Sequence, residues 1–286
     1  MFFGIEAGGT KFNCAVGHGT EIVEELRVPT TSPAETLGTC KAFFERAADR
    51  HGQPEGLGIA TFGPIDLESG TIGATPKRGW PGTNIVAPFK SFGCPIAIET
   101  DVTGAAIGEA NHGAGVGVDP VVYLTVGTGI GGGAIVGGRP LRGDPHPEMG
   151  HILISRRIDD VFEGTCPHHD SCLEGLACGP AISQRWGKPS HALGDDLDAA
   201  IDLEADYLAQ GIAAIVAVLA PRRIIVGGGV MEVPGLLEAT RERLFQKLNR
   251  YPGAAAHTDP ASFLVPPGLG GRAGMVGALV MAAGSS

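Results

Sequence analysis

The chain has 286 residues, of which 43% are hydrophobic and 18% charged, so it can form one large or two ordinary domains around a substantial core. Its net charge of −10, without a cluster of lysines or arginines, argues against nucleic acid as the main partner. No hydrophobic run approaches the length that spans a bilayer, and the N-terminal MFFGIEAGG lacks the basic segment of a signal peptide, so we expect a cytoplasmic protein without a membrane partner.

Residues 1–115 carry the pattern of a small α/β domain. Three short strands open the chain, and a glycine-rich turn with a lysine joins the first two. Hydrophobic residues at helical spacing predict a helix over 33–52, whose end is marked by a glycine. Buried strands are expected at 56–63 and 94–101, and the second leads at Asp101 into a short helix of small residues.

The same order of elements starts again in the second half of the chain. A strand, a glycine turn and another strand occupy 121–138, and a long amphipathic helix is expected over 197–221. Two successive units of one pattern predict a duplicated α/β protein, whose ligand lies in a cleft between the halves, beyond the carboxyl ends of the strands. We expect domains at 1–115 and 116–271, with the C-terminal helix, about 272–286, returning to the first.

Glycine-rich turns follow three of the expected strands. Glycine lets backbone N–H groups approach an anion without obstruction, so such turns can hold the phosphates of a nucleotide. An ordinary hairpin or strand–helix corner is the alternative for any one of them, and none matches the Walker pattern. Three together favour a nucleotide site, with the second turn expected to extend to Gly133. The candidate residues are Gly8, Gly9, Thr10, Lys11, Gly127, Thr128, Gly129, Gly227 and Gly228.

Residues 148–175 hold the pattern of a metal site. Six cysteines in a chain of this length do not indicate a small disulfide scaffold, but two of them belong to a C-x-x-H-x-x-C motif. A further histidine lies fifteen residues before the motif, and four Cys and His ligands are typical of a closed, structural zinc site. His168 is an alternative to His169. The candidate ligands are His151, Cys166, His169 and Cys172.

The order and spelling of these motifs resemble the ROK family of sugar kinases, which belongs to the actin-like ATPase superfamily with its ribonuclease H-like fold. Residues 6–11 (EAGGTK) are similar to the first phosphate motif of the family, 124–133 to the second and 225–230 to its adenosine motif. EMGH at 148–151, followed by the cysteine-bearing loop, is similar to its signature. The resemblance covers essentially the whole chain, and TFGPIDL, ATPKRGWPGTNIV and CPHHDSCLEGLACGPAI are most similar to bacterial fructokinases.

The resemblance implies an enzyme that uses ATP, Mg²⁺ and a structural Zn²⁺ to phosphorylate a hexose, with conversion of D-fructose to fructose 6-phosphate as the first expectation. It implies that Asp101 is the general base, although by position alone we would interpret it as a helix N-cap. It also implies that Glu148, His151 and Glu174 bind the sugar, where solvation is the ordinary fate of an isolated glutamate. The family favours His169 as the zinc ligand, and its members are commonly homodimers.

Other functions of the same fold stay open at this point. A glucokinase, a mannokinase or an amino-sugar kinase would share these motifs. A sugar-sensing regulator would need a helix-turn-helix domain, yet only five residues precede Glu6. A non-catalytic sugar binder would not need Asp101 or Lys11. Glu6 and Glu99 stand where relatives more often have aspartate, and Thr103 replaces asparagine, which leaves the sugar preference in doubt.

The segment KRGWPG is expected in a loop near the sugar. Its tryptophan, Trp80, is interpreted as a packing residue of that loop. Lys77 and Arg78 beside it are interpreted as surface charges outside the site.

Overall fold

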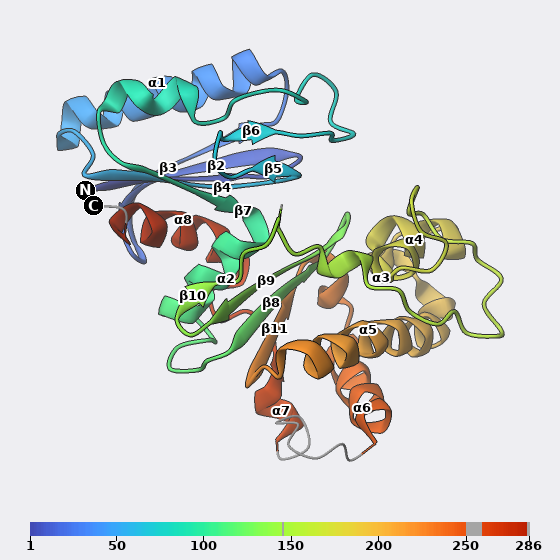
Figure 1. Ribbon diagram of the computed structural model, residues 1–286. Coiled ribbons are helices and arrows are strands. Elements are labelled where there is room, and N and C mark those ends of the chain that lie inside the picture. Colours follow the sequence, from blue (N-terminus) through green and yellow to red (C-terminus); the bar gives the residue numbers. More distant parts are fainter. Residues whose placement is uncertain (145, 250–258, 285–286) are drawn as a thin grey trace. The chain divides into compact units, whose positions relative to one another are not determined.

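The computed structural model describes residues 1–144, 146–249 and 259–284, and it divides into two compact units (Figure 1). Unit 1 comprises Met1–Val116, Pro140–His146 and Gly268–Ser286. Unit 2 comprises Gly117–Arg139 and Pro147–Pro267. The short return of the chain to unit 1 after residue 139 has no signal in the sequence. The last two residues of the C-terminal helix expected at about 272–286 lie outside the described residues.

Unit 1 is built on one five-stranded sheet in the order β3-β2-β1-β4-β7. β1 pairs antiparallel with β2 and β2 with β3, whereas β1, β4 and β7 run parallel. Helix α1 covers one face of the sheet, and α2 and α8 cover the other (Figure 1). The elements are β1 (Phe2–Ala7), β2 (Lys11–His18), β3 (Glu21–Pro29), α1 (Pro33–His51), β4 (Gly56–Thr61), β5 (Ile65–Asp66), β6 (Thr71–Ile72), η1 (Ala87–Phe92), β7 (Ile96–Thr100), α2 (Asp101–His112), η7 (Gly270–Arg272) and α8 (Ala273–Gly284).

The core of unit 1 between its sheet and α1 combines aromatic and aliphatic side chains. Phe3 of β1 stacks on Phe44 of α1 with their ring centroids 4.7 Å apart. Trp80 is fully buried and lies against Phe12 of β2 at 5.4 Å, so the prediction that it packs in the core is confirmed. The start of α1 is fixed by Ser32, whose side chain accepts the amide of Glu35.

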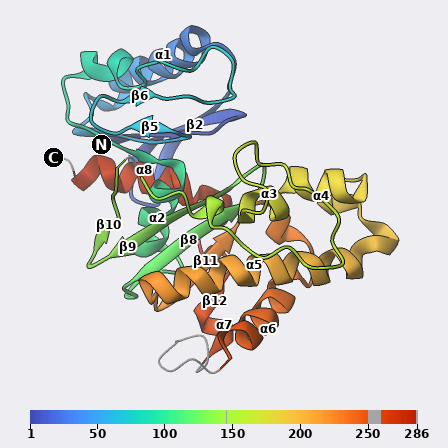
Figure 2. The same ribbon diagram turned by 45° about the vertical axis from the view of Figure 1, so that its right-hand side comes forward.

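Unit 2 repeats this architecture with the order β10-β9-β8-β11-β12. β8 pairs antiparallel with β9 and parallel with β11, as β1 does with β2 and β4, so the predicted duplication is confirmed. The long helix α5 lies beside α6 (Figure 2). The elements are β8 (Val121–Val126), β9 (Ile130–Val136), β10 (Arg139–Pro140), η2 (Met149–His151), α3 (Leu173–Ala177), α4 (Gly179–Trp186), η3 (Ser190–Ala192), η4 (Gly194–Asp196), α5 (Leu197–Leu219), β11 (Arg223–Gly227), η5 (Gly229–Glu232), α6 (Leu236–Leu248), α7 (Pro260–Phe263) and β12 (Leu264–Val265).

The second glycine turn is shorter than the sequence predicts. Strand β9 already begins at Ile130, so Gly131, Gly132 and Gly133 are strand residues rather than turn residues. Glycine is needed inside this strand because a Cβ on Gly132 would lie 2.5 Å from the sulfur of Met149. The expectation of a turn through Gly133 is therefore wrong, since these glycines pair within β9 and Gly132 serves close packing.

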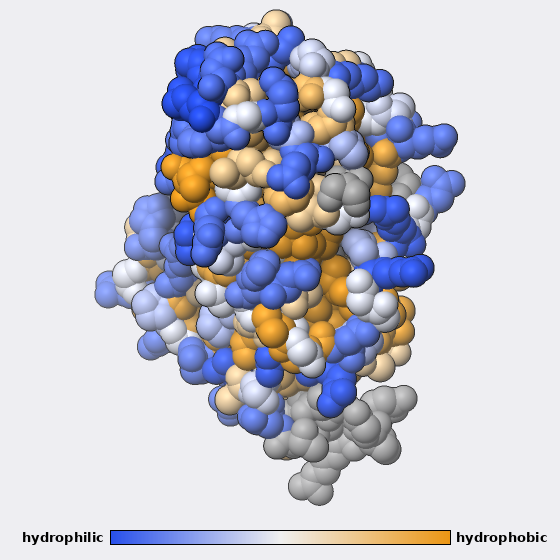
Figure 3. Space-filling model, turned by 90° about the vertical axis from the view of Figure 1, so that its left-hand side faces the viewer, coloured by the Kyte–Doolittle hydropathy of each residue, from blue (hydrophilic) through white to orange (hydrophobic). Residues whose placement is uncertain are grey.

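The surface mixes hydrophilic and hydrophobic side chains on the face drawn in Figure 3, which is ordinary for a folded protein. Within the described ranges, no helix combines the length and the apolar character that crossing a membrane requires.

Helices α2 and α8 of unit 1 approach each other through glycines. A Cβ added to Gly277 of α8 would lie 1.8 Å from the carbonyl oxygen of Gly104 in α2. A Cβ on Gly108 would lie 2.3 Å from the carbonyl oxygen of Ala273. Because backbone atoms occupy this space, a flexible side chain cannot move aside to make room.

We predict that Gly277→Ala lowers the free energy of unfolding by about 1–3 kcal/mol, because the added methyl group overpacks the contact between α2 and α8. Gly38→Ala is the matched control, since Gly38 lies in the interior of α1 with nothing within 4 Å of an added Cβ. The free energy of unfolding of Gly38→Ala should rise by roughly 0.5–1 kcal/mol, because alanine has a higher helix propensity than glycine. Urea unfolding measures both, and equal stability of the two variants would contradict the close contact.

Candidate functional site

In unit 1, strand register brings the first glycine turn and Asp101 to one edge of the sheet. Ala7 at the end of β1 pairs with Thr61 of β4, and Thr61 pairs with Thr100 of β7. The turn that starts at Gly8 and the helix that starts at Asp101 therefore leave the sheet at the same carboxyl edge, two strand spacings or about 10 Å apart.

The first glycine turn is closed by its own backbone and by the threonine that follows β3. The amide of Gly8 donates to the carbonyl oxygen of Lys11 at 2.9 Å. Thr30 donates its amide to the carbonyl oxygen of Thr10 at 3.0 Å and its hydroxyl to that of Gly8 at 2.8 Å. These hydrogen bonds hold the turn through the carbonyl groups of Gly8, Thr10 and Lys11. Gly9 at the tip of the turn has no Cβ to hinder an approaching anion.

Glu6 lies beside this turn at the end of β1. Asn13 of β2 donates to its carboxylate at 2.7 Å. Burial raises the pKa of the Glu6 carboxyl, and the Asn13 hydrogen bond and the Lys11 ammonium oppose that shift. A Cβ on Gly274 would lie 2.6 Å from the Glu6 carboxylate, so α8 packs directly against this group.

Asp101 is not the N-cap that its position suggested. Thr100 is the N-cap of α2, and its hydroxyl accepts the amide of Thr103 at 3.2 Å and donates to the Thr103 hydroxyl at 2.8 Å. Asp101 is the first helical residue, half-exposed, and it accepts the amide of Val102 at 2.9 Å. The helix dipole stabilises its ionised form.

The preceding acidic residue, Glu99, is bound by an arginine that no sequence motif marks. Glu99 is 4% exposed, and Arg142 donates its Nε to the carboxylate at 2.8 Å. Both residues belong to unit 1, since Arg142 lies in its inserted segment Pro140–His146. The carboxylate that replaces the more usual aspartate is therefore neutralised two residues before Asp101.

In unit 2, two further glycine turns meet at the carboxyl edge of β8 and β11. Gly228 packs on β8, because a Cβ there would lie 2.4 Å from the carbonyl oxygen of Val126. The amide of Gly179, at the start of α4, donates to the carbonyl oxygen of Gly127 at 2.7 Å. Gly227 is the last residue of β11, and a Cβ on it would lie 2.7 Å from Pro267. Gly227 and Gly228, two of the candidate nucleotide-binding residues, are therefore closely packed against their neighbours at this edge of the sheet.

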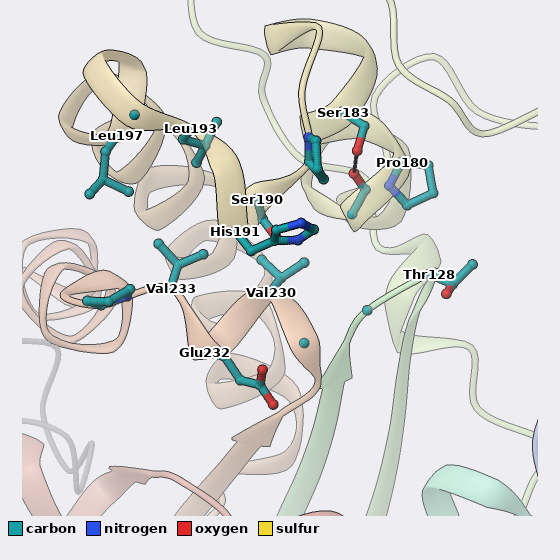
Figure 4. A pocket seen from close by; sticks show the side chains of 16 residues that line it. Thr128, Pro180, Ser183, Ser190, His191, Leu193, Leu197, Val230, Glu232 and Val233 are labelled. Atoms are coloured by element: carbon teal, nitrogen blue, oxygen red, sulfur yellow. Dashed lines mark hydrogen bonds between the residues drawn. The ribbon is translucent and has the colours of Figure 1, made fainter.

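A cavity of about 740 Å³ opens above these turns (Figure 4). Its size lies within the roughly 300–1,000 Å³ range of small-molecule sites. Gly127 and Thr128 line it together with Gly229. The lining also includes residues that no glycine motif marks: Pro180, Ser183, His191 and Glu232. They come from α4, η3 and η5, which only folding brings together.

The four predicted metal ligands of unit 2 form one cluster. Their ligand atoms all lie within 4.8 Å of one another, and all six cysteines of the chain are free thiols. His151 Nδ1 lies 3.8 Å from the sulfur of Cys166 and 3.7 Å from that of Cys172. His169 Nδ1 lies 3.5 Å from the sulfur of Cys166. His168 is exposed and outside the cluster.

The cluster fits a tetrahedral zinc ion. Zinc–sulfur bonds of about 2.3 Å and zinc–nitrogen bonds of about 2.0–2.1 Å at tetrahedral angles separate sulfur from nitrogen by about 3.6 Å. The three sulfur–nitrogen distances of 3.5–3.8 Å agree with that value. Because Nδ1 of His151 faces the sulfurs, its Nε2 is left for another partner.

Glu148 and Glu174 flank the cluster on the chain. Glu174 accepts the amide of Ile130 at 2.8 Å, and a Cβ on Gly129 would lie 2.6 Å from its carboxylate. Glu174 is thus fixed against the Gly127–Gly129 turn, and Gly129 serves that contact. Glu148 precedes η2 and accepts the amide of His151 through its carbonyl oxygen at 3.0 Å.

A buried group of polar side chains ties the loop between η2 and α3 to the helices of unit 2. Arg185 of α4 pairs with Asp160 of the loop at 3.1 Å, and both side chains are nearly inaccessible. Tyr207 of α5 donates to Asp160 at 2.6 Å. Burial acts to raise the pKa of Asp160, but the Tyr207 hydroxyl, the amide of Phe162 and Arg185 outweigh it and lower the pKa.

Glu204 of α5 is buried beside this group. Within the described part of the chain its Oε1 has no hydrogen-bond partner. Burial raises its pKa well above the usual value, and Arg185 opposes that shift only in part.

The two units together define the class of the protein. Each has one sheet of the same strand order, with a glycine turn after its first parallel strand, which is the architecture of the actin-like ATPases. The chain belongs to the ROK family, whose model matches residues 2–285.

Three similar proteins narrow this assignment. A putative fructokinase of Bacillus subtilis is 44% identical over 99% of this chain and 95% of its own length. A fructokinase of Zymomonas mobilis is 44% identical over 97% of this chain and 95% of its own. The crystal structure of a ROK family glucokinase from Streptomyces griseus, in complex with glucose and AMPPNP, aligns over 99% of both chains with a TM-score of 0.79 and 26% identity.

We predict that Glu204→Gln stabilises the protein increasingly as the pH rises. The unfolded chain releases the Glu204 proton near pH 4.3, whereas the folded protein holds it to a higher pH, so the wild type loses stability upward from about pH 4.3. The glutamine keeps the shape of the protonated acid and removes that loss. Urea unfolding at pH 5 and pH 8 measures the effect, with the exposed Glu242→Gln in α6 as the control. A gain equal at both pH values would contradict the raised pKa.

Proposed function

We propose that this chain is an ATP-dependent fructokinase that converts D-fructose to fructose 6-phosphate. The observation that carries the proposal is the near-full-length similarity to two bacterial proteins named as fructokinases, one of them putative. The geometry within each unit is compatible with it, because the phosphate turns and the Cys–His cluster are formed. A glucokinase, the name of a relative of lower identity, is the alternative.

Asp101 is the general base of the proposed reaction. Its carboxylate takes the proton of the 6-hydroxyl of the sugar while that oxygen bonds to the γ-phosphorus and the bond to ADP breaks. Its place at the carboxyl edge of β7 and its ionised form at a helix start support this role. Thr100 supports it too, because it caps α2 and spares Asp101 that task.

The glycine turns hold ATP in this proposal. Thr10 and Lys11 bind phosphate oxygens over the turn formed by Gly8 and Gly9, as do the amides of Thr128 and Gly129 in the turn that Gly127 begins, and the cavity above Gly227 and Gly228 takes the adenosine. Glu6 binds a water of Mg²⁺, whose chemical contribution is to neutralise phosphate charge. Hydrogen bonding by Asn13 keeps that carboxylate in place.

The Cys–His cluster holds a structural zinc and orients the sugar in this proposal. His151, Cys166, His169 and Cys172 are its ligands, which leaves His151 Nε2–H to donate to a sugar hydroxyl. Glu148 and Glu174 accept neighbouring hydroxyls. The contact of Glu174 with Ile130 supports a fixed carboxylate at that place.

The proposed enzyme acts in the cytoplasm, where ATP is available to it, and as a homodimer. Size-exclusion chromatography with light scattering tests the assembly directly.

We predict ADP release with D-fructose well above that with glucose, mannose or N-acetylmannosamine, because 44% identity favours the fructokinases over relatives of other specificity. A coupled assay at matched sugar concentrations measures the four rates. A higher kcat/KM for glucose than for fructose would mean that the protein is a glucokinase. Activity on none of these sugars would exclude a function as a sugar kinase.

Asp101→Asn is the companion measurement. It should lower kcat by a factor on the order of 10²–10⁴, since the amide cannot accept the proton, while fructose binding by calorimetry is kept. Near-normal turnover would exclude Asp101 as the base.

We predict about one zinc per chain, held by His169 and not by His168. His169→Ala should lose the zinc and His168→Ala should keep it, because His169 turns its Nδ1 towards Cys166 whereas His168 lies outside the cluster. Elemental analysis of both purified variants measures the metal content. Loss of zinc in His168→Ala alone would reverse the assignment of the ligand.

A further inference from the structure

The sequence context of Lys77 suggested a free surface charge. The structure differs from that interpretation. Its Cε and Nζ are 3.9 and 4.0 Å from a Cβ built on Gly9, at the tip of the first glycine turn. Apart from the adjoining Gly8 and Thr10, no other atom of the described residues lies within 4 Å of that position. Among these residues the space next to Gly9 is therefore occupied by the end of the Lys77 side chain alone. Arg78, the next residue, is exposed and contacts no described residue through an ion pair or hydrogen bond.

The loop that carries Lys77 is anchored by the core. Trp80 is 0% exposed, and its Nε1 donates to the carbonyl oxygen of Thr31 at 2.9 Å. The backbone amide of Trp80 donates to the carbonyl oxygen of Lys77 at 3.1 Å, which closes a turn between them. Gly82 donates to the carbonyl oxygen of Ile72 at 2.8 Å. The lysine thus extends from a fixed backbone.

The charges around the turn favour an anion. Lys77 has no carboxylate within ion-pair distance among the residues that the structure describes, and the same holds for Lys11. Glu6 is the neighbouring acid, and Asn13 already binds its carboxylate. Two ammonium groups at one glycine turn, with a single acid nearby, leave positive charge for a phosphate group to neutralise.

We propose that Lys77 is a catalytic residue whose Nζ binds the phosphoryl group during its transfer over Gly9, an inference that rests on the proposed kinase function. Asp101 leaves the same sheet edge about 10 Å from this turn, a separation that a sugar hydroxyl and a phosphoryl group span together. In the transfer, negative charge is spread over the three equatorial oxygens of the phosphoryl group, and a fixed cation stabilises them. The 6-phosphate of the product carries the same group, so Lys77 also contacts the product.

The test compares Lys77→Met with its neighbour Arg78→Met. Lys77→Met should lower kcat by a factor on the order of 10²–10³, as loss of one preorganised donor does in other enzymes. Its KM for fructose should change less than about threefold, because the contact is made to the phosphoryl group and not to the sugar. Lys77→Arg should restore part of kcat, and Arg78→Met should match the wild type.

Product binding separates a catalytic role from a structural one. Calorimetry without nucleotide should show that Lys77→Met weakens the affinity for fructose 6-phosphate by roughly 10–100-fold while the affinity for fructose is unchanged. Equal loss of both affinities, or a lowered Tm that accounts for the loss of kcat, would mean that Lys77 only supports the loop. Unchanged kcat in Lys77→Met would overturn the proposal outright.

The two proposals fail in different ways. If the wild type turns over another hexose and not fructose, the proposed function fails, and the Lys77 comparison is repeated with that hexose and its 6-phosphate. If the wild type phosphorylates fructose and Lys77→Met does so equally well, only the role of Lys77 fails.

Discussion

The parallel pairing of β1 with β4 and of β4 with β7 is the constraint on which unit 1 depends. Register places the ends of these strands at one edge, so residues that follow them, Gly8 and Asp101, need no further structure to become neighbours. Helix packing and a buried tryptophan support the elements that form this edge. Glycines such as Gly277 let α2 and α8 pack closely beneath it, and buried Trp80 anchors a loop above it.

Unit 2 has a sheet of the same strand order, but different features lie at its carboxyl edge. Its edge carries a cavity formed by two glycine turns and by the short helices α4, η3 and η5. Between η2 and α3 the chain has little regular structure, and backbone hydrogen bonds alone do not order such a segment. The Cys–His cluster holds one side of this loop and the buried Arg185–Asp160 pair the other. Glu174, two residues after Cys172, is held by the amide of Ile130.

Sequence patterns predicted the elements well wherever one physical signal dominated. Helix α5 follows its apolar period and ends one residue before Ala220, which adopts a left-handed conformation ahead of a proline. The pattern misled where a residue type has two uses. Gly132 allows Met149 to pack instead of exposing backbone, and Thr100 takes the cap that Asp101 was thought to provide. Lys77 was interpreted as an ordinary surface charge, because the residues of its own segment do not indicate which turn the loop lies against.

The sequence by itself determined the duplicated α/β fold, the family and the Cys–His cluster, because periodicity and ligand spacing are local properties of the chain. Tertiary structure alone decided which distant groups meet. The pairing of Glu99 with Arg142 spans 43 positions, and Lys77 lies against Gly9 from a separate loop. Such contacts depend on the register of strands and on buried anchors such as Trp80, which fix side chains through packing that no short segment encodes.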